Sequence, residues 1–114
     1  MNVSPFFKLE IFAPAESVDE ILEVLAGVHA GEIGNYDHCS TVYQVQGSYR
    51  PLEGASPAVG EVGKMFYGGE CKIEVNCREA FLQEAIQAVR EVHPYEEPVI
   101  NVIPLANARY GATV

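Results

Sequence analysis

Apolar and polar residues alternate along four stretches of the chain, and two further stretches repeat apolar residues with helical spacing. A period of two is typical of a half-buried β-strand, and a period of 3.6 is typical of an amphipathic helix. The pattern predicts strands over residues 5–13, 40–50, 65–76 and 99–105, and helices over residues 17–27 and 78–92. The predicted order is therefore strand, helix, strand, strand, helix, strand.

The two helices are bounded by recognisable signals. Pro14 ends the first strand, and Ser17 followed by Glu20 forms a capping-box pattern, which predicts the first helical turn. That helix ends near Gly27. The second helix places its apolar residues on one stripe: Phe81, Leu82, Ala85, Ile86, Val89 and Val92.

This order predicts an α+β fold, a ferredoxin-like βαββαβ sandwich in which a four-stranded antiparallel sheet carries two helices on one face. In this topology the first and third strands are central. Pro98 and Pro104 flank the fourth strand, which agrees with an edge position. Gly68 and Gly69 predict a bulge or bend in the third strand. One sheet face and a long edge strand stay uncovered, so we expect a homo-oligomer.

Length, charge and cysteine content indicate the number of domains, the expected partners and the state of the thiols. The 114 residues suit one domain, residues 1–114. The net charge of −9 argues against nucleic acid and anionic membranes as partners. No apolar run approaches the roughly 20 residues that span a bilayer, and the first residues do not resemble a secretion signal, so we expect a cytoplasmic protein. Cys39, Cys71 and Cys77 fit neither a disulfide framework nor a CxxC site, which predicts reduced thiols.

Three short segments combine turn-forming residues with functional side chains. The first covers residues 31–40 (GEIGNYDHCS), where glycines and an Asn/Asp pair predict a tight loop. The second covers residues 50–64 (RPLEGASPAVGEVGK), a long loop without periodicity. The third covers residues 93–98 (HPYEEP), whose two prolines predict a stiff connector between the second helix and the fourth strand.

The predicted topology places the long loop and the connector at the same end of the sheet. We therefore expect Arg50 to pair with Glu96 or Glu97, because a guanidinium and a carboxylate form a directional bond that would hold the loop on the connector.

Together the three segments resemble the insert domain of the NIF-three-like proteins, also called GTP cyclohydrolase type 2-like proteins. The connector is also similar to a His-Pro-Tyr-Glu segment of the CutA divalent-cation tolerance family. The resemblance covers most of the chain and implies a PII-like, ferredoxin-like fold and, for CutA, a trimer. Full-length NIF-three-like proteins carry a dinuclear metal site on two flanking lobes. These lobes have no counterpart in the 114 residues, so we expect no catalytic centre here.

The expected function is that of a small oligomeric PII/CutA-like binding or regulatory module, with a small ligand or a partner held in clefts between subunits. The ligand-binding residues we expect are Asn35, Tyr36, Asp37, Arg50, Glu53, Lys64, Tyr95 and Glu96.

Two alternatives remain open. One is a site for a divalent transition metal, zinc or copper, with His93, Glu97 and, from a neighbouring subunit, His38 as ligands, since imidazole and carboxylate suit these ions. The competing interpretation is that His93 only caps the second helix, where a histidine interacts favourably with the helix dipole. The other alternative is a metal-dependent hydrolase, which the resemblance suggests. No catalytic residues can be assigned to it, because Cys39 beside His38 lacks the geometry of an activated nucleophile.

Overall fold

The computed structural model describes residues 5–112. Its elements are β1 (Phe6–Ala13), η1 (Ala15–Ser17), α1 (Val18–Gly27), β2 (Thr41–Tyr49), β3 (Phe66–Arg78), η2 (Glu79–Phe81), α2 (Leu82–Val92), β4 (Ile100–Pro104) and η3 (Asn107–Tyr110). The strands form one antiparallel sheet in the order β2-β3-β1-β4. The predicted ferredoxin-like sandwich is thus confirmed, with β1 and β3 central.

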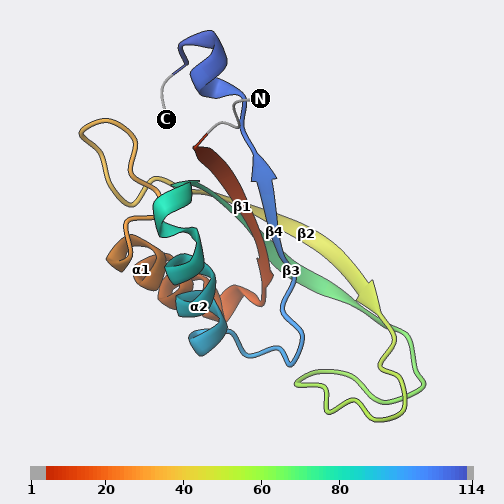
Figure 1. The fold of residues 1–114 in the computed structure, drawn as a ribbon. Helices are drawn as coiled ribbons and strands as arrows, with labels where there is room; N and C mark the ends of the chain where they lie inside the picture. The colour runs from red at the N-terminus through yellow and green to blue at the C-terminus, as the bar shows by residue number, and fades with distance from the viewer. Residues whose placement is uncertain (1–4, 113–114) are drawn as a thin grey trace.

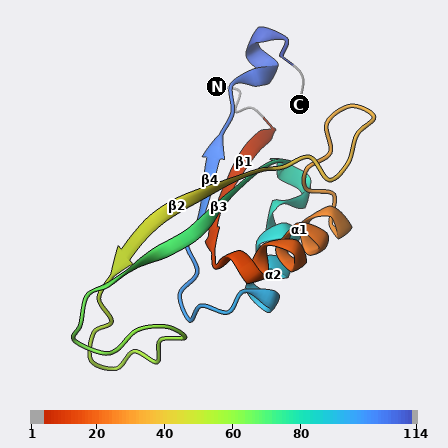
Figure 2. The same ribbon diagram turned by 180° about the vertical axis from the view of Figure 1, so that it is seen from behind.

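Both helices pack against the same face of the sheet, as Figures 1 and 2 show from opposite sides. The core lies between this face and the helices, because every second side chain of β1 and β3 points toward them. Its largest fully buried side chains are Leu9, Ile11, Ile21, Leu25, Ile73 and Val89. Within the part of the chain that the structure describes, no helix is long and apolar enough to cross a membrane.

The buried thiols serve as small apolar core groups. Cys71 and Cys77 lie on the helix-facing side of β3 and are buried, whereas Cys39 is half-buried in a loop. Burial raises the pKa of the Cys77 thiol to about 11. All three cysteines are free, as their spacing predicted.

The predicted cap at Ser17 and the predicted bulge at the glycine pair are absent from the described residues. Ser17 makes no side-chain cap, because its backbone is already helical and the 3-10 turn η1 starts directly after Pro14. The glycine pair does not make a bulge, because β3 pairs with β2 one residue to one residue from Phe66 to Glu74. Gly68 lies directly opposite Gly47, so one cross-strand pair of this regular ladder has no side chains.

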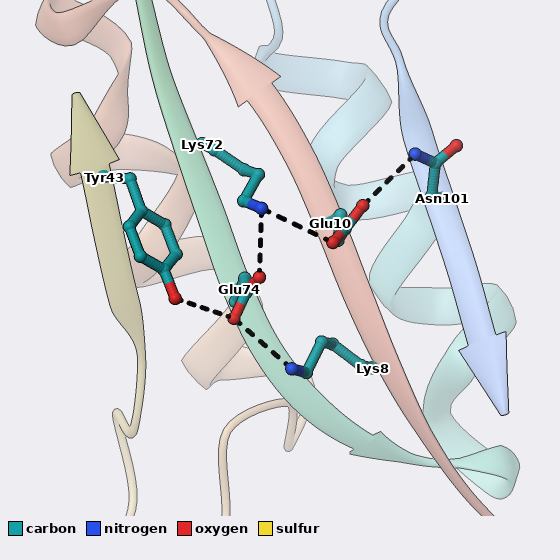
Figure 3. Close-up of polar contacts among 6 residues, drawn as sticks. All are labelled: Lys8, Glu10, Tyr43, Lys72, Glu74 and Asn101. Atoms are coloured by element: carbon teal, nitrogen blue, oxygen red, sulfur yellow. Dashed lines mark hydrogen bonds and ion pairs between the residues drawn. The ribbon is translucent and has the colours of Figure 1, made fainter. Parts of the chain in front are cut away.

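The sheet face opposite the helices carries a connected set of charged and polar side chains (Figure 3). Glu10 and Glu74 are direct cross-strand neighbours, an arrangement that is destabilising without a counter-charge. Lys72 Nζ lies 3.6 Å from Glu10 Oε2 and 3.2 Å from Glu74 Oε2, and Lys8 Nζ lies 3.3 Å from Glu74 Oε1. The two lysines therefore neutralise the glutamate pair.

Candidate ligand-binding cleft

A cleft of about 580 Å³ lies at the end of the sheet, beyond the end of β1. It arises from unequal strand lengths: Ala13, the last residue of β1, pairs with Cys71, whereas β3 begins at Phe66 and stays paired with β2. The β2–β3 ribbon therefore extends past the helices, and the loop over residues 50–65 folds back toward the connector (Figure 1). The volume is in the range of small-molecule sites.

The walls of the cleft are mainly apolar. The cleft is lined by the end of β2, the first half of the long loop, the connector, and one residue each of β1 and β3. The apolar members that shape it are Phe12, Val45, Pro51, Ala55, Pro57 and Val99.

His93 fixes the start of the connector. Its Nε2 lies 2.7 Å from the carbonyl oxygen of Phe12, which only accepts, so Nε2 carries the proton. Its Nδ1 accepts the backbone N–H of Tyr95 at 3.1 Å. The ring is buried and lies 4.9 Å from the Tyr95 ring. A neutral imidazole with one defined tautomer thus joins the end of α2, the end of β1 and the connector.

The long loop is held on the connector through Glu96, as predicted, but the group that bonds to Glu96 is not the predicted Arg50. The backbone N–H of Ser56 donates to Glu96 Oε1 at 3.1 Å. Among residues 5–112, Arg50 makes no ion pair with Glu96 or Glu97, so the predicted pairing is wrong. A backbone amide is the nearer donor, because the loop returns across the connector several residues after Arg50.

Two further bonds give the loop its shape. The N–H of Gly63 donates to the carbonyl oxygen of Pro51 at 2.8 Å and closes the base of the loop. The hydroxyl of Tyr49 donates to the carbonyl oxygen of Val59. The Tyr49 ring also packs on Phe66, with 5.1 Å between centroids. One wall of the cleft is therefore an ordered loop tied to the end of β2.

The charges that line the cleft are unbalanced. Three carboxylates, from Glu70, Glu96 and Glu97, face one guanidinium, from Arg50. Burial first, and then the negative charge of Glu70, raise the pKa of Tyr95. The cleft is thus a negative environment at neutral pH.

The paired glycines make room for Glu70. A Cβ on Gly47 would lie 2.1 Å from Glu70 Oε2, so this carboxylate occupies the space above Gly47. On the neighbouring strand, a Cβ on Gly68 would lie 2.6 Å from the ring of Phe66. The absence of two side chains lets an acidic group and an aromatic ring lie flat on the end of the β2–β3 ribbon.

The cleft contains only part of the predicted ligand-binding set. Arg50, Tyr95 and Glu96 line it, together with Glu97. Glu53 and Lys64 belong to the same loop but do not line the cleft, and Lys64 Nζ pairs with Glu61 Oε2 at 2.8 Å. That these residues bind a ligand remains a prediction.

The remaining predicted residues lie in the loop before β2, away from the cleft. Asn35 and Tyr36 belong to a small exposed turn that is closed by mutual backbone bonds between Ile33 and Tyr36. Asp37 Oδ1 lies 3.0 Å from His38 Nδ1, and Glu23 Oε1 of α1 lies 3.6 Å from His38 Nε2. The bond with Asp37, supported by Glu23, raises the pKa of His38.

The predicted metal ligands do not converge. Both ring nitrogens of His93 hold backbone groups, while the ring nitrogens of His38 contact Asp37 and Glu23. In residues 5–112 no three His, Cys, Asp or Glu side chains are arranged to hold a metal ion. The residues as placed do not fit a zinc or copper site within one chain, and a site shared between subunits remains a prediction.

Sequence reasoning did not assign Val45 or Glu70 to the site. These residues face the cleft because β2 and β3 continue past the end of β1. The predicted strand lengths contain part of this information, because the third strand (residues 65–76) is predicted to be longer than the first (residues 5–13). The lengths alone did not show which strand ends would be offset, because the offset depends on register.

Comparison with known proteins relates the chain to one part of larger proteins. No family model matches it. It is 37% identical over 101 residues to a GTP cyclohydrolase 1 type 2 homolog of Halalkalibacterium halodurans, and 34% identical over 101 residues to that of Bacillus subtilis. Each match covers 89% of this chain and 27% of the relative. The chain therefore spans about a quarter of the length of these relatives.

Solved structures place the same fold in two settings. A Bacillus cereus protein related to NIF3 matches with a TM-score of 0.80 and 30% identity, over 94% of this chain and 27% of that one. The periplasmic divalent cation tolerance protein CutA from Archaeoglobus fulgidus matches with a TM-score of 0.67 and 22% identity, over 88% and 83%. The second likeness shows the fold alone. The chain is thus similar in sequence and structure to one CutA-like domain that makes up about a quarter of the GTP cyclohydrolase 1 type 2 homologues.

Proposed function

We propose that the chain is a small binding or regulatory module without a catalytic centre of its own, which holds a small ligand in the cleft between the β2–β3 ribbon, the long loop and the connector. The observation that carries this proposal is the cleft itself, which has apolar walls and a few convergent polar groups. Two of the segments that carry the resemblance to the NIF-three-like proteins, the long loop and the connector, line this cleft and are bonded to each other there.

We further propose that the module is a trimer in the cytoplasm, without nucleic-acid partners. The long edge strand β2 and the helix-free sheet face support association, because an open edge favours pairing with another chain. Exposed apolar side chains on and beside the two edge strands add to this: Val42, Tyr43, Tyr67, Val99, Val102 and Ile103. The net charge of −9 opposes binding to phosphate backbones.

Light scattering at micromolar concentration tests the oligomer. The expected mass is three times the chain mass of 12.4 kDa. Val42→Lys places a charge on the exposed edge strand and is expected to lower the mass, whereas Glu20→Lys on the exposed face of α1 is the control and leaves it unchanged. A wild-type protein with the mass of one chain contradicts the trimer.

NMR titration of the labelled protein tests the cleft. The neutral probe 4-ethylphenol is expected to shift the amide resonances of cleft residues in a saturable way, since its flat apolar body suits the walls. Ala55→Trp fills the cleft and is expected to abolish these shifts, whereas Ala80→Trp in η2, outside the cleft, leaves them unchanged. Equal shifts in both variants would place the binding elsewhere.

A further inference from the structure

The cleft combines a negative charge with an apolar body. Of its four charged side chains, three are carboxylates. Glu96 already accepts the Ser56 N–H, whereas the carboxylate of Glu70 has no hydrogen bond or ion pair within residues 5–112. Glu70 is also half-buried, and Arg50 is exposed. The unpaired negative charge therefore lies deeper in the cleft than the positive one.

Half-buried and unpaired carboxylates are costly, because their lost hydration is not replaced. Elsewhere on the same sheet face, neighbouring lysines compensate the charge of the carboxylates by pairing with Glu10 and Glu74. The ladder has no lysine opposite Glu70, which pairs with Val45. The strand register thus leaves one acidic group of this face without a counter-charge, and that group faces the cleft.

Aromatic rings surround the same space. Tyr49 and Tyr95 line the cleft, and Phe12 lies on its wall. The faces of such rings attract cations, an effect that strengthens when the cation is partly removed from water. A cation bound near Glu70 would therefore be stabilised by a carboxylate and by ring faces together.

The occupant that fits these features is organic. A bare metal ion needs several converging donors, and the described residues offer no such group. A volume of about 580 Å³ with mainly apolar walls has room for a carbon skeleton as well as a charge.

We propose that the ligand of the cleft is an organic amine, with a protonated amino group that pairs with Glu70 and a flat apolar body that packs against Val45, Val99 and the tyrosine rings. This inference rests on the proposed function, since it names the class of ligand for the same cleft.

Three probes with one body and different charge test it: tyramine (cationic), 4-ethylphenol (neutral) and 3-(4-hydroxyphenyl)propionate (anionic). NMR titration of the full chain gives a Kd for each. We expect tyramine to bind roughly tenfold more tightly than 4-ethylphenol, the gain typical of a hydrogen-bonded ion pair, and the anion to bind most weakly.

Glu70→Gln keeps the shape of the side chain and removes its charge. It is expected to reduce tyramine affinity about tenfold and to leave 4-ethylphenol affinity unchanged. Glu97→Gln, at an exposed position of the same cleft, gives a smaller loss and covers the case in which Glu70→Gln does not fold. Glu84→Gln on α2 is the control and changes neither affinity.

The outcomes separate the two proposals. Equal binding of all three probes leaves the proposed function standing and overturns the amine. Tightest binding of the anion also overturns it and assigns the leading role to Arg50. Tyramine affinity that is unchanged in both Glu70→Gln and Glu97→Gln overturns the pairing with the cleft carboxylates. No binding of any probe contradicts both the amine and the cleft as a ligand site.

Discussion

Gly31 determines how the chain enters the loop before β2. Its φ of +84° lies in the left-handed region, and a Cβ there would be 2.7 Å from the carbonyl oxygen of Cys39. Its own N–H donates to the carbonyl oxygen of Asn76 at 2.8 Å, and its carbonyl oxygen accepts the N–H of Cys39 at 2.9 Å. Backbone freedom at one residue thus lets the loop close against β3.

We expect Gly31→Ala to lower the free energy of unfolding by about 2 kcal/mol or more, because strain at positive φ and the clash with Cys39 add. Urea denaturation measures the change. Gly27→Ala is the matched control, since beyond its own helix and chain neighbours no atom lies within 4 Å of its added Cβ. The control is expected to be neutral or to stabilise by up to about 1 kcal/mol, because it lies in α1. Equal losses in the two variants would contradict this role of Gly31.

His93→Ala is expected to lower the free energy of unfolding by about 2 to 3 kcal/mol, because it leaves the carbonyl oxygen of Phe12 and the N–H of Tyr95 without their partner. His93→Gln is expected to recover part of this loss, since an amide can donate and accept as the ring does. Arg90→Ala, at an exposed position near the end of α2, is the control. A loss in His93→Ala no larger than in the control would refute the anchoring role.

At the scale of elements, the helix-free sheet face is stabilised by charge compensation across strands. Glu10 of β1 lies opposite Glu74 of β3, and Lys72 approaches both. Burial opposes ionisation of Glu74, but the bonds with Lys72 and Lys8 outweigh it, so the pKa of Glu74 is lowered. Its pairing therefore stabilises the fold at neutral pH, and this contribution is lost as the pH falls below about 4.5 through the lowered value.

Lys72→Met is expected to lower the free energy of unfolding by about 1 kcal/mol at pH 7, because Glu10 and Glu74 then repel each other. The difference from the wild type should shrink as the pH falls through the lowered pKa of Glu74, because protonation of Glu74 removes the repulsion. Lys64→Met is the control, since Lys64 forms an exposed pair within a loop and should change stability by less than about 0.5 kcal/mol. A loss in Lys72→Met that does not depend on pH would point to lost packing instead of charge.

At the scale of the molecule, an elongated shape follows from the long β2–β3 ribbon. The principal extents are 48 × 31 × 23 Å, and the long loop lies at the opposite end from η3 (Figure 1). A loop this far from the helical core needs its own attachment. The bond from Ser56 to Glu96 provides one, and it joins the loop to a connector that His93 anchors.

Glu96→Ala is expected to speed hydrogen exchange of the Ser56 amide by roughly tenfold, the effect of losing one bond to a charged acceptor. Exchange measured by NMR reports it directly. Glu97→Ala, the neighbouring exposed glutamate, is the control and should leave the rate unchanged. An unaltered rate in Glu96→Ala would show that the loop is held by other contacts.

Periodicity along the chain was sufficient to predict the four strands, the two α-helices and their order, and the topology with the flanking prolines predicted the edge position of β4. These features depend on which residues are apolar over a few turns or strand positions, and the hydrophobic effect acts on that pattern directly. The apolar stripe predicted for the second helix likewise contains Ala85 and Val89, which are buried. Proximity of the long loop to the connector followed from topology alone.

Contacts between residues far apart in the sequence required the tertiary structure. His93 holds a carbonyl group of β1, Glu96 accepts an amide of the long loop, and Glu70 faces the cleft without a counter-charge. Each depends on strand register and on where a backbone donor or acceptor lies, and residue type does not encode these positions. His93 and Glu96, the side chains that the sequence singles out, therefore bond to backbone groups. The unpaired charge in the cleft comes from Glu70.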